Sequence, residues 1–330
     1  MPGKIERQKD HATALDALAV TLARFATGTR VKTLSEYLHI CWAPSKISNI
    51  VNATLAFIKT WWGNFIDLDT RFFATPADAE HLAKAISERP GLPKVPYNFI
   101  VGFIDGTSFQ ICRPTEDQES YYNGNERHHC LRYQGLVLPN GIMAGMFGPY
   151  PRTYMRRYCG VPISNESPAP YPLQLGASND KGLYTKSKWE NALEALFHGT
   201  DYMIYGDAGY GLSTRLAPPL RPCDNHEHYA EINQAMSSVR VAVEMAFGDI
   251  KNNFNYLQNF SQLKVGLNDI GFAFMFGAFM CNILTCIHRS NRISGIFQLV
   301  PPTLEYLPLD TDFRGDNPEE SDMEVESDDE

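Results

Sequence analysis

The sequence predicts an α/β fold preceded by a small helical region, and three observations support this. Apolar runs of strand length occupy residues 99–105 and 202–205, and each leads to an aspartate. The stretch "CLRYQGLVLPNGIMAGMFG", residues 130–148, predicts two strands joined by a hairpin at its Pro-Asn-Gly turn. Helical periodicity extends over residues 231–251, and a second apolar segment of helical length covers residues 270–287.

The helical region is expected to span residues 1–95. Apolar residues recur at helical spacing over residues 12–27, and two short helices joined by a tight turn are expected at residues 33–58. A capping box formed by Thr33 and Glu36 would start the first of these, and Ser45 would start the second. The second helix exposes a face suited to phosphates and base edges, which comprises Lys46, Ser48, Asn49 and Asn52. This pattern is typical of a DNA-binding helix-turn-helix, although any small helical bundle shows it.

A Pro/Gly cluster, "ERPGLPKVP", closes that region and predicts a domain boundary, so that residues 96–309 form a second domain. The remaining residues, 310–330, hold eleven acids and one base, and are expected to form a disordered acidic tail. The tail carries the excess negative charge, because the rest of the chain has a net charge of +1. The overall acidity therefore does not exclude a nucleic acid as partner.

The seven cysteines contain no Cys-x-x-Cys pair, which favours free thiols in a reducing compartment over a zinc cluster. Neighbouring His128 and His129 precede Cys130 but point to opposite faces of a strand. His226 and His228 lie near Cys223 without a fourth ligand. The apolar segment 270–287 just reaches the length of a membrane helix, but contains Asn282 and two glycines. We expect a buried helix capped by Asp269 and no membrane association.

Two predicted strands lead to an aspartate followed by small residues, in "GFIDGT" and "IYGDAGY". Asp105 and Asp207 would each occupy a rigid strand end, where glycines let a ligand approach the backbone. Asp-Gly is also a common turn. A third acid, Glu244, lies beside the apolar helix stripe of Val239, Val243 and Phe247, with open space expected at Gly248. The alternative for Glu244 is an ion pair with Arg240 one turn earlier.

Asp105, Asp207 and Glu244 are therefore predicted to converge as catalytic residues and metal ligands. Clustered carboxylates repel one another unless cations neutralise them. Oxygen ligands without histidine or thiolate favour Mg²⁺ or Mn²⁺, and two such ions support in-line displacement at phosphorus.

The blocks "IDGT", "YGDAGYGL" and "SSVRVAVEMAFGDIK" resemble the three acidic blocks of Harbinger-type DDE transposases and the nucleases derived from them. The order of the acids and the 36 residues between Asp207 and Glu244 are similar to that family, and the likeness covers about residues 97–308. The resemblance implies an RNase H-like mixed sheet with flanking helices. It also implies a divalent-metal-dependent DNA endonuclease in the nucleus, with a separate DNA-binding protein or a second copy as additional partner.

The sequence departs from that family in one segment. Where the family carries a basic segment ending in His-Asp, this chain reads "GPYPRTYMRRYCGV". This departure favours the alternative of a catalytically silent, domesticated protein that binds DNA or acts as an adaptor.

Overall fold

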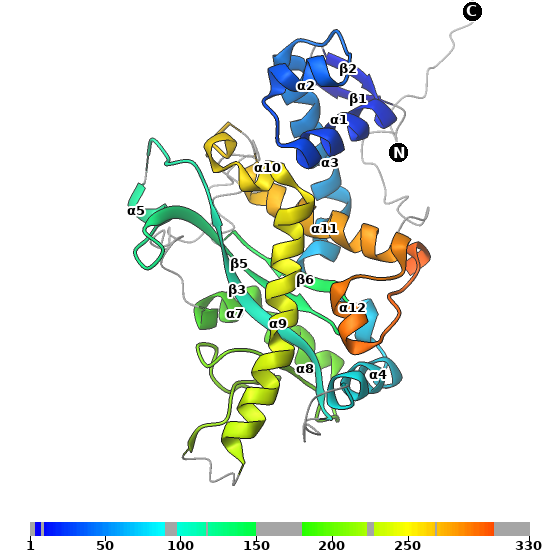
Figure 1. Cartoon of the computed structure of the whole chain (residues 1–330), viewed down its shortest axis with the longest axis vertical. Helices are drawn as coiled ribbons and strands as arrows, with labels where there is room; N and C mark the ends of the chain where they lie inside the picture. The colour runs from blue at the N-terminus through cyan, green and yellow to red at the C-terminus, as the bar shows by residue number, and fades with distance from the viewer. Residues whose placement is uncertain are drawn as a thin grey trace, which may run out of the picture.

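The computed structural model (Figure 1) describes residues 4–7, 10–89, 98–116, 118–149, 180–222, 228–267 and 269–306. Its centre is a six-stranded sheet in the order β4-β5-β3-β7-β8, with β6 on β5. The strands are β3 (Ile100–Gln110), β4 (Tyr122–Asn123), β5 (His128–Val137), β6 (Met143–Phe147), β7 (Met203–Tyr205) and β8 (Leu216–Ala217). β4, β5 and β6 run antiparallel to their neighbours, whereas β3, β7 and β8 are parallel.

This mixed sheet with flanking helices confirms the predicted fold class, and it is consistent with an RNase H-like fold. The hairpin between β5 and β6 is also confirmed. Leu138 and Ile142 pair across it, and Gly141 at its tip has a φ of +84°, which a residue with a side chain rarely adopts.

Helices cover both faces of the sheet. The helices after β6 are α7 (Asp180–Ser187), α8 (Trp189–Leu196), α9 (Tyr229–Asn253), α10 (Asn255–Gln258), α11 (Ile270–His288) and α12 (Arg292–Phe297). Phe247 of α9 packs over Gly135 of β5, whereas Ser187 of α7 bonds to the neighbouring Gln134. Adjacent strand residues point to opposite faces, so α9 and α7 lie on opposite sides. Figure 1 shows the long helix α9 lying over the strands of the sheet.

The apolar helix α11 belongs to the core, as predicted. By length and composition it could cross a membrane, but 72% of its apolar window is buried inside the fold. Asp269 accepts a hydrogen bond from the amide of Phe272 at 3.1 Å and caps its start. The side chain of Asn282 pairs with both backbone groups of Met143 on β6, at 2.9 and 2.8 Å. A polar residue in this helix therefore ties it to the edge of the sheet.

The N-terminal region is helical, as predicted, with a small hairpin in front. Its elements are β1 (Lys4–Arg7), β2 (Asp10–Thr13), α1 (Ala14–Thr27), α2 (Val31–Tyr37), α3 (Pro44–Asp67), a 3₁₀ turn (Thr70–Phe73) and α4 (Pro76–Ser87). The predicted capping box is wrong. α2 begins at Val31, with Arg30 as N-cap and no side-chain cap, so Thr33 already lies inside the helix. α3 continues well past the predicted end and reaches β6, because Ile58 and Ile66 keep its apolar face buried.

The N-terminal helices share the core of the sheet domain. Phe25 of α1 packs against Phe254, Tyr256 and Phe276, with ring centroids 6.1, 5.1 and 4.7 Å away. One hydrophobic cluster includes side chains from α1, α3 and the sheet. The division at residue 95 stays a prediction. The predicted boundary residues 90–95, the Pro-rich loop, the segment without His-Asp and the acidic tail lie outside the described residues.

Candidate functional site

Asp105 and Asp207 lie at matching levels of two neighbouring parallel strands. The last parallel pair between β3 and β7 is Phe103 with Tyr205, and each aspartate follows its partner in that pair by two residues. Residues two apart on a strand share a face, so the register brings the two carboxylates to one edge. Asp105 does not end its strand, since β3 continues to Gln110 beside β5. Only the parallel pairing between β3 and β7 ends just before Asp105.

Asp105 occupies a partly desolvated position, with 16% of its side chain exposed. The pKa of Asp105 is raised to about 6, chiefly by burial and to a smaller extent by the charges of Asp207 and Asp180. Arg240 and the amide of Gly106 act in the opposite direction. The Gly106 N–H donates to Oδ1 of Asp105 at 2.9 Å. Near neutral pH this carboxylate is therefore charged, but at a cost that a nearby cation would relieve.

Arg240 on α9 joins the first and third predicted acids. Its Nη1 donates to Oδ2 of Asp105 at 2.7 Å, and its Nη2 lies 3.4 Å from Oε1 of Glu244. The Glu244 side chain is 54% exposed. The ion pair considered as the alternative for Glu244 is therefore present. The contact of the same guanidinium with Asp105 has no sequence signal, because 135 residues separate the two.

The three predicted ligands do not close around a single point. In the part of the chain that the structure describes, one group of three potential metal ligands has all its donor atoms within 4.8 Å, and it consists of Glu126, His128 and Cys130. Asp105 and Glu244 are instead held on either side of a guanidinium. A shared cation would have to compete with Arg240 for these oxygens.

Glycine at position 135 sets the height of α9 above the site. Gly135 is the partner of Asp105 across the β3–β5 pairing. A Cβ at Gly135 would lie 2.8 Å from the Phe247 ring, closer than real side chains pack. Phe247 is one turn from Glu244, so its contact with bare backbone brings α9 close to the acids. The open space expected at Gly248 is confirmed, because a Cβ there would meet nothing within 4 Å.

A fourth acid, Asp180 of α7, lies near Asp105 but over the opposite face of the sheet from α9, and no sequence pattern predicted it. Its Oδ1 would lie 2.0 Å from a Cβ on Gly106, so it rests on the glycine that follows Asp105. Arg132 donates to it at 2.7 Å. Burial raises the pKa of Asp180, opposed by Arg132, and the charge of Asp207 adds to the rise. Asp180 directly follows a Pro-rich segment whose sequence has neither strand nor helix periodicity, so the sequence contains no signal that marks it as a site residue.

Tyr210 lies beneath this cluster rather than on the surface. Its side chain is only 3% exposed. Its hydroxyl is buried and has no hydrogen-bond partner within the described residues. Burial raises the pKa of Tyr210 well above its usual range, and the charges of Asp180, Asp105 and Asp207 add to this. All three aspartates are therefore close enough to Tyr210 to raise the pKa of its hydroxyl.

The donor set fits a hard divalent cation in part. Asp105 and Asp207 offer carboxylate oxygens only, the ligands that Mg²⁺ and Mn²⁺ prefer, whereas Asp180 lies over the other face and is held by Arg132. The mutual repulsion that contributes to the raised pKa of Asp105 and of Asp180 indicates unneutralised negative charge. Glu244 fits less well, because it is half-exposed and paired with Arg240.

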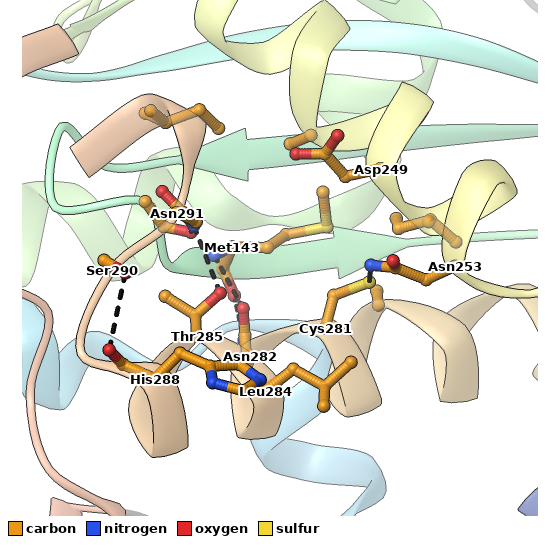
Figure 2. A pocket seen from close by; sticks show the side chains of 15 residues that line it. Met143, Asp249, Asn253, Cys281, Asn282, Leu284, Thr285, His288, Ser290 and Asn291 are labelled. Carbon is orange, nitrogen blue, oxygen red and sulfur yellow. Dashed lines mark hydrogen bonds between the residues drawn. The ribbon is translucent and has the colours of Figure 1, made fainter. Parts of the chain in front are cut away.

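A cavity of about 200 Å³ lies apart from these acids, between α9 and α11 (Figure 2). Its polar side chains have structural partners: Asn282 holds β6, and Asn291 donates to the carbonyl of Gly141 at 2.8 Å. Burial raises the pKa of the Cys281 thiol to about 11, which makes it a poor nucleophile. Asp249 lines this cavity and pairs with Arg292 at 3.4 Å, so it cannot substitute for Glu244.

The helix-turn-helix segment offers a partly covered surface. Ile50 of α3 packs with Ala12 and Ala17 of the preceding hairpin and helix. Lys46 lies with its ammonium 4.6 Å from the centre of the Trp42 ring. The four polar residues of the expected outward face are half-buried: Lys46, Ser48, Asn49 and Asn52. The role of this face in DNA binding stays a prediction.

Comparison with known proteins adds one finding. Residues 172–285 match the family described as DDE superfamily endonuclease. The match covers about a third of the chain, includes Asp207 and Glu244, and begins after Asp105. No curated protein and no solved structure matched the chain. The similarity thus covers the segment that carries two of the three predicted acids.

Proposed function

We propose that the chain is a divalent-metal-dependent DNA endonuclease of the DDE class, derived from a Harbinger-type transposase. Asp105, Asp207 and Glu244 are the proposed catalytic residues and ligands for two Mg²⁺ or Mn²⁺ ions. The observation that carries the proposal is the strand register, which sets Asp105 beside Asp207. Support also comes from the family match, which extends over the two acids that follow.

The chemistry divides between the cations and the chain. The bound ions would activate the attacking water or 3′-hydroxyl and stabilise the leaving oxygen. Asp105 and Asp207 would hold negative charge at adjacent points of the rigid sheet. Cations held by Asp105 and Glu244 would have to displace the Arg240 guanidinium, which contacts both carboxylates. Arg132 keeps Asp180 fixed beside the site.

A second candidate function is favoured by the same arginine. Arg240 already neutralises Asp105 and Glu244, as a cation would. A domesticated, catalytically silent protein that binds DNA or acts as an adaptor would keep such an arrangement for stability alone. The missing His-Asp motif in the sequence agrees with this candidate. In either case the proposed partner is DNA in the nucleus, bound with the help of the helices at residues 33–58. A separate DNA-binding protein or a second copy remains part of the proposal.

Nicking of supercoiled plasmid by the purified full chain distinguishes the two functions. The nuclease should convert plasmid to the open circle in Mn²⁺ or Mg²⁺ and not in EDTA. Asp207→Ala and Glu244→Ala should each lower the rate at least about a hundredfold, as losses of groups that act in the transition state do. Asp249→Ala is the matched control, since this acid lies on the same helix and lines the separate cavity.

Nicking by Asp207→Ala at the wild-type rate would assign the activity to a contaminant. If the wild type does not nick in either metal but still binds duplex DNA, the endonuclease proposal is wrong and the silent DNA-binding protein stands. The domain division at residue 95 can be tested with the same preparations, because two independent domains would survive limited proteolysis there as folded fragments, whereas regions that share a core would not.

A further inference from the structure

We propose that Glu126, His128 and Cys130 form a second metal site, which takes a borderline-soft divalent cation such as Zn²⁺. The donor atoms of these residues lie within 4.8 Å of one another. The site is separate from the aspartates in its chemistry, because thiolate and imidazole select Zn²⁺ rather than Mg²⁺. The sequence predicted no zinc site in this stretch, because the adjacent His128 and His129 point to opposite faces of the strand. The partner of His128 on its own face is Cys130.

Strand geometry brings His128 and Cys130 together. Both belong to β5 and lie two residues apart, so their side chains project from the same face. Cys130 is fully buried, whereas 29% of the His128 side chain is exposed. The site therefore has a sulfur ligand at its base and a nitrogen ligand at the protein surface. A cation could enter from solvent on the side of His128.

The imidazole of His128 is already oriented as a metal ligand. Its Nδ1 lies 2.9 Å from the backbone carbonyl of Glu126. A carbonyl only accepts hydrogen bonds, so Nδ1 donates to it; Nε2 faces the Glu126 carboxylate, with which it forms an ion pair when protonated, and a bound cation would take the place of that proton. Metal-bound histidines commonly use this bond to a carbonyl to fix the tautomer and the ring. The bond therefore points to a ligand at Nε2.

The third ligand, Glu126, is held by a tight turn. The side-chain oxygen of Asn123 accepts from the amides of Asn125 and Glu126, at 3.0 and 3.3 Å. The amide of Arg127 donates to the Asn123 carbonyl at 2.8 Å, and Arg127 adopts a φ of +57°. This turn sets Oε2 of Glu126 2.9 Å from Nε2 of His128.

The spacing fits a tetrahedral ion after a small adjustment. Zinc bonds of about 2.0 Å to nitrogen and oxygen imply a separation of about 3.3 Å between those two ligands. Glu126 can open by the missing few tenths of an ångström, because 35% of its side chain is exposed. Three protein ligands would leave the fourth position for water.

Charge also fits a divalent cation. Glu126 and a Cys130 thiolate would supply two negative charges, and the thiol proton would pass to the buffer when the metal binds. Burial raises the pKa of the Cys130 thiol, so the thiolate forms together with the bound cation and not before it. Arg132 lies 3.9 Å from the other oxygen of Glu126 and links this turn to Asp180. A cation here would stabilise the turn next to the nuclease site.

Titration of the metal-free full chain with Co²⁺ tests the proposal. Cobalt replaces zinc in such sites and gives a near-ultraviolet absorption band when a thiolate binds it. We expect this band in the wild type, its displacement by Zn²⁺, and no effect of excess Mg²⁺. Cys130→Ser should abolish the band. Glu126→Gln, on an exposed turn where misfolding is no concern, should lower the Co²⁺ affinity at least about tenfold.

Two matched controls use neighbouring residues of the same type. His129→Ala removes the adjacent imidazole, which lies on the opposite face with its ring 5.5 Å from that of Tyr122. Cys112→Ser removes a half-buried thiol outside the group. Both variants should keep the wild-type band. The proposal is overturned if the wild type gives no thiolate band, if the band survives Cys130→Ser, or if Glu126→Gln leaves the affinity unchanged.

Discussion

The contact between Arg240 and Asp105 decides the chemistry of the candidate site at the scale of single residues. A carboxylate with a pKa of about 6 and an arginine at 2.7 Å form a charge pair that is mostly shielded from water. The raised pKa means that the arginine offsets only part of the cost of burying this carboxylate, and loss of the arginine would leave the charge less compensated still. The same pair competes with metal binding, so the stability of the site and its proposed activity oppose each other.

Asp105→Asn should therefore stabilise the fold in a pH-dependent way. The pKa of Asp105 is higher in the folded state than its ordinary value of 3.8, so the folded protein holds this proton more tightly. The stabilisation from that proton is complete below about pH 3.8 and is lost as the pH rises through about 6. Above pH 6 the variant should exceed the wild type by at most about 3 kcal/mol, and the difference should vanish near pH 4. Urea unfolding at pH 4, 6 and 8 measures it.

Mg²⁺ supplies the control for that experiment. A cation bound at Asp105 stabilises the wild type but not the variant, so the difference at pH 8 should shrink as Mg²⁺ is added. A difference that is independent of both pH and Mg²⁺ would contradict the assigned environment of Asp105.

Arg240→Gln should have the opposite effect on the fold. The loss of the guanidinium leaves Asp105 with less compensation, so we expect a loss of roughly 1–3 kcal/mol at pH 8 and a pKa of Asp105 above 6. Mg²⁺ should restore more stability in this variant than in the wild type, because the competing charge is gone. Thermal unfolding with and without Mg²⁺ tests this, and an equal response of the two proteins would show that Arg240 does not compete with the cation.

At the scale of secondary-structure elements, the position of α9 over the sheet determines which side chains can meet. The strands β3 and β7 fix the positions of the two aspartates. Arg240 reaches Asp105, with Glu244 beside it, because Phe247 packs against the bare backbone of Gly135. The distance between a helix and a sheet is set by the residues at their contact. A glycine in a strand therefore controls the geometry of the acids on a helix.

Gly135→Ala should move α9 away from Asp105. The added Cβ would lie 2.8 Å from the Phe247 ring, so the helix or the ring must shift, at a cost of about 1–3 kcal/mol. Any nuclease activity should fall with it, because Glu244 moves with the helix. Gly248→Ala is the control on the same helix, where a Cβ meets nothing and should stabilise by about 0.5–1 kcal/mol. Equal stability of the two variants would contradict the packing described.

At the scale of the whole molecule, the N-terminal helices and the sheet domain are joined through aromatic packing around Phe25. This side chain is completely buried among rings of α10, of α11 and of Phe254, the residue between α9 and α10. The chain continues past Phe25 through Gly28, whose φ of +62° and close approach to the backbone of Asn255 leave no room for a Cβ. The two regions should therefore unfold together.

Phe25→Ala should destabilise the whole chain by about 3–5 kcal/mol, the usual cost of emptying a large aromatic position in a core. Far-ultraviolet circular dichroism and tryptophan fluorescence should report one coincident transition at a lower temperature. Leu15→Ala is the control on the same helix, because Leu15 is 76% exposed and its loss should change stability by less than about 0.5 kcal/mol. Two separate transitions would instead support two independent domains.

The sequence by itself determined the elements and the order of the acids. The apolar runs, the Pro-Asn-Gly hairpin and the apolar segment before His288 follow local rules of periodicity and turn chemistry, so β5, β6, β7, α9 and α11 were predicted. β3 was predicted too short, and the two-residue strands β4 and β8 were not predicted. The start of α2 was missed, because a capping box is a local preference that packing overrides. Asp105 and Asp207 were found because each follows an apolar run and precedes small residues.

Only the tertiary structure decided what those acids contact. The pairing of Asp105 with Arg240, the position of Asp180 on Gly106, and the grouping of Glu126 with His128 and Cys130 depend on contacts across the sheet or through a turn. Electrostatic energies depend on distance and burial, and the order of residues in the chain fixes neither when they are far apart. The same charges can therefore hold a metal or an arginine, and the packing of α9 on the sheet determines which is present.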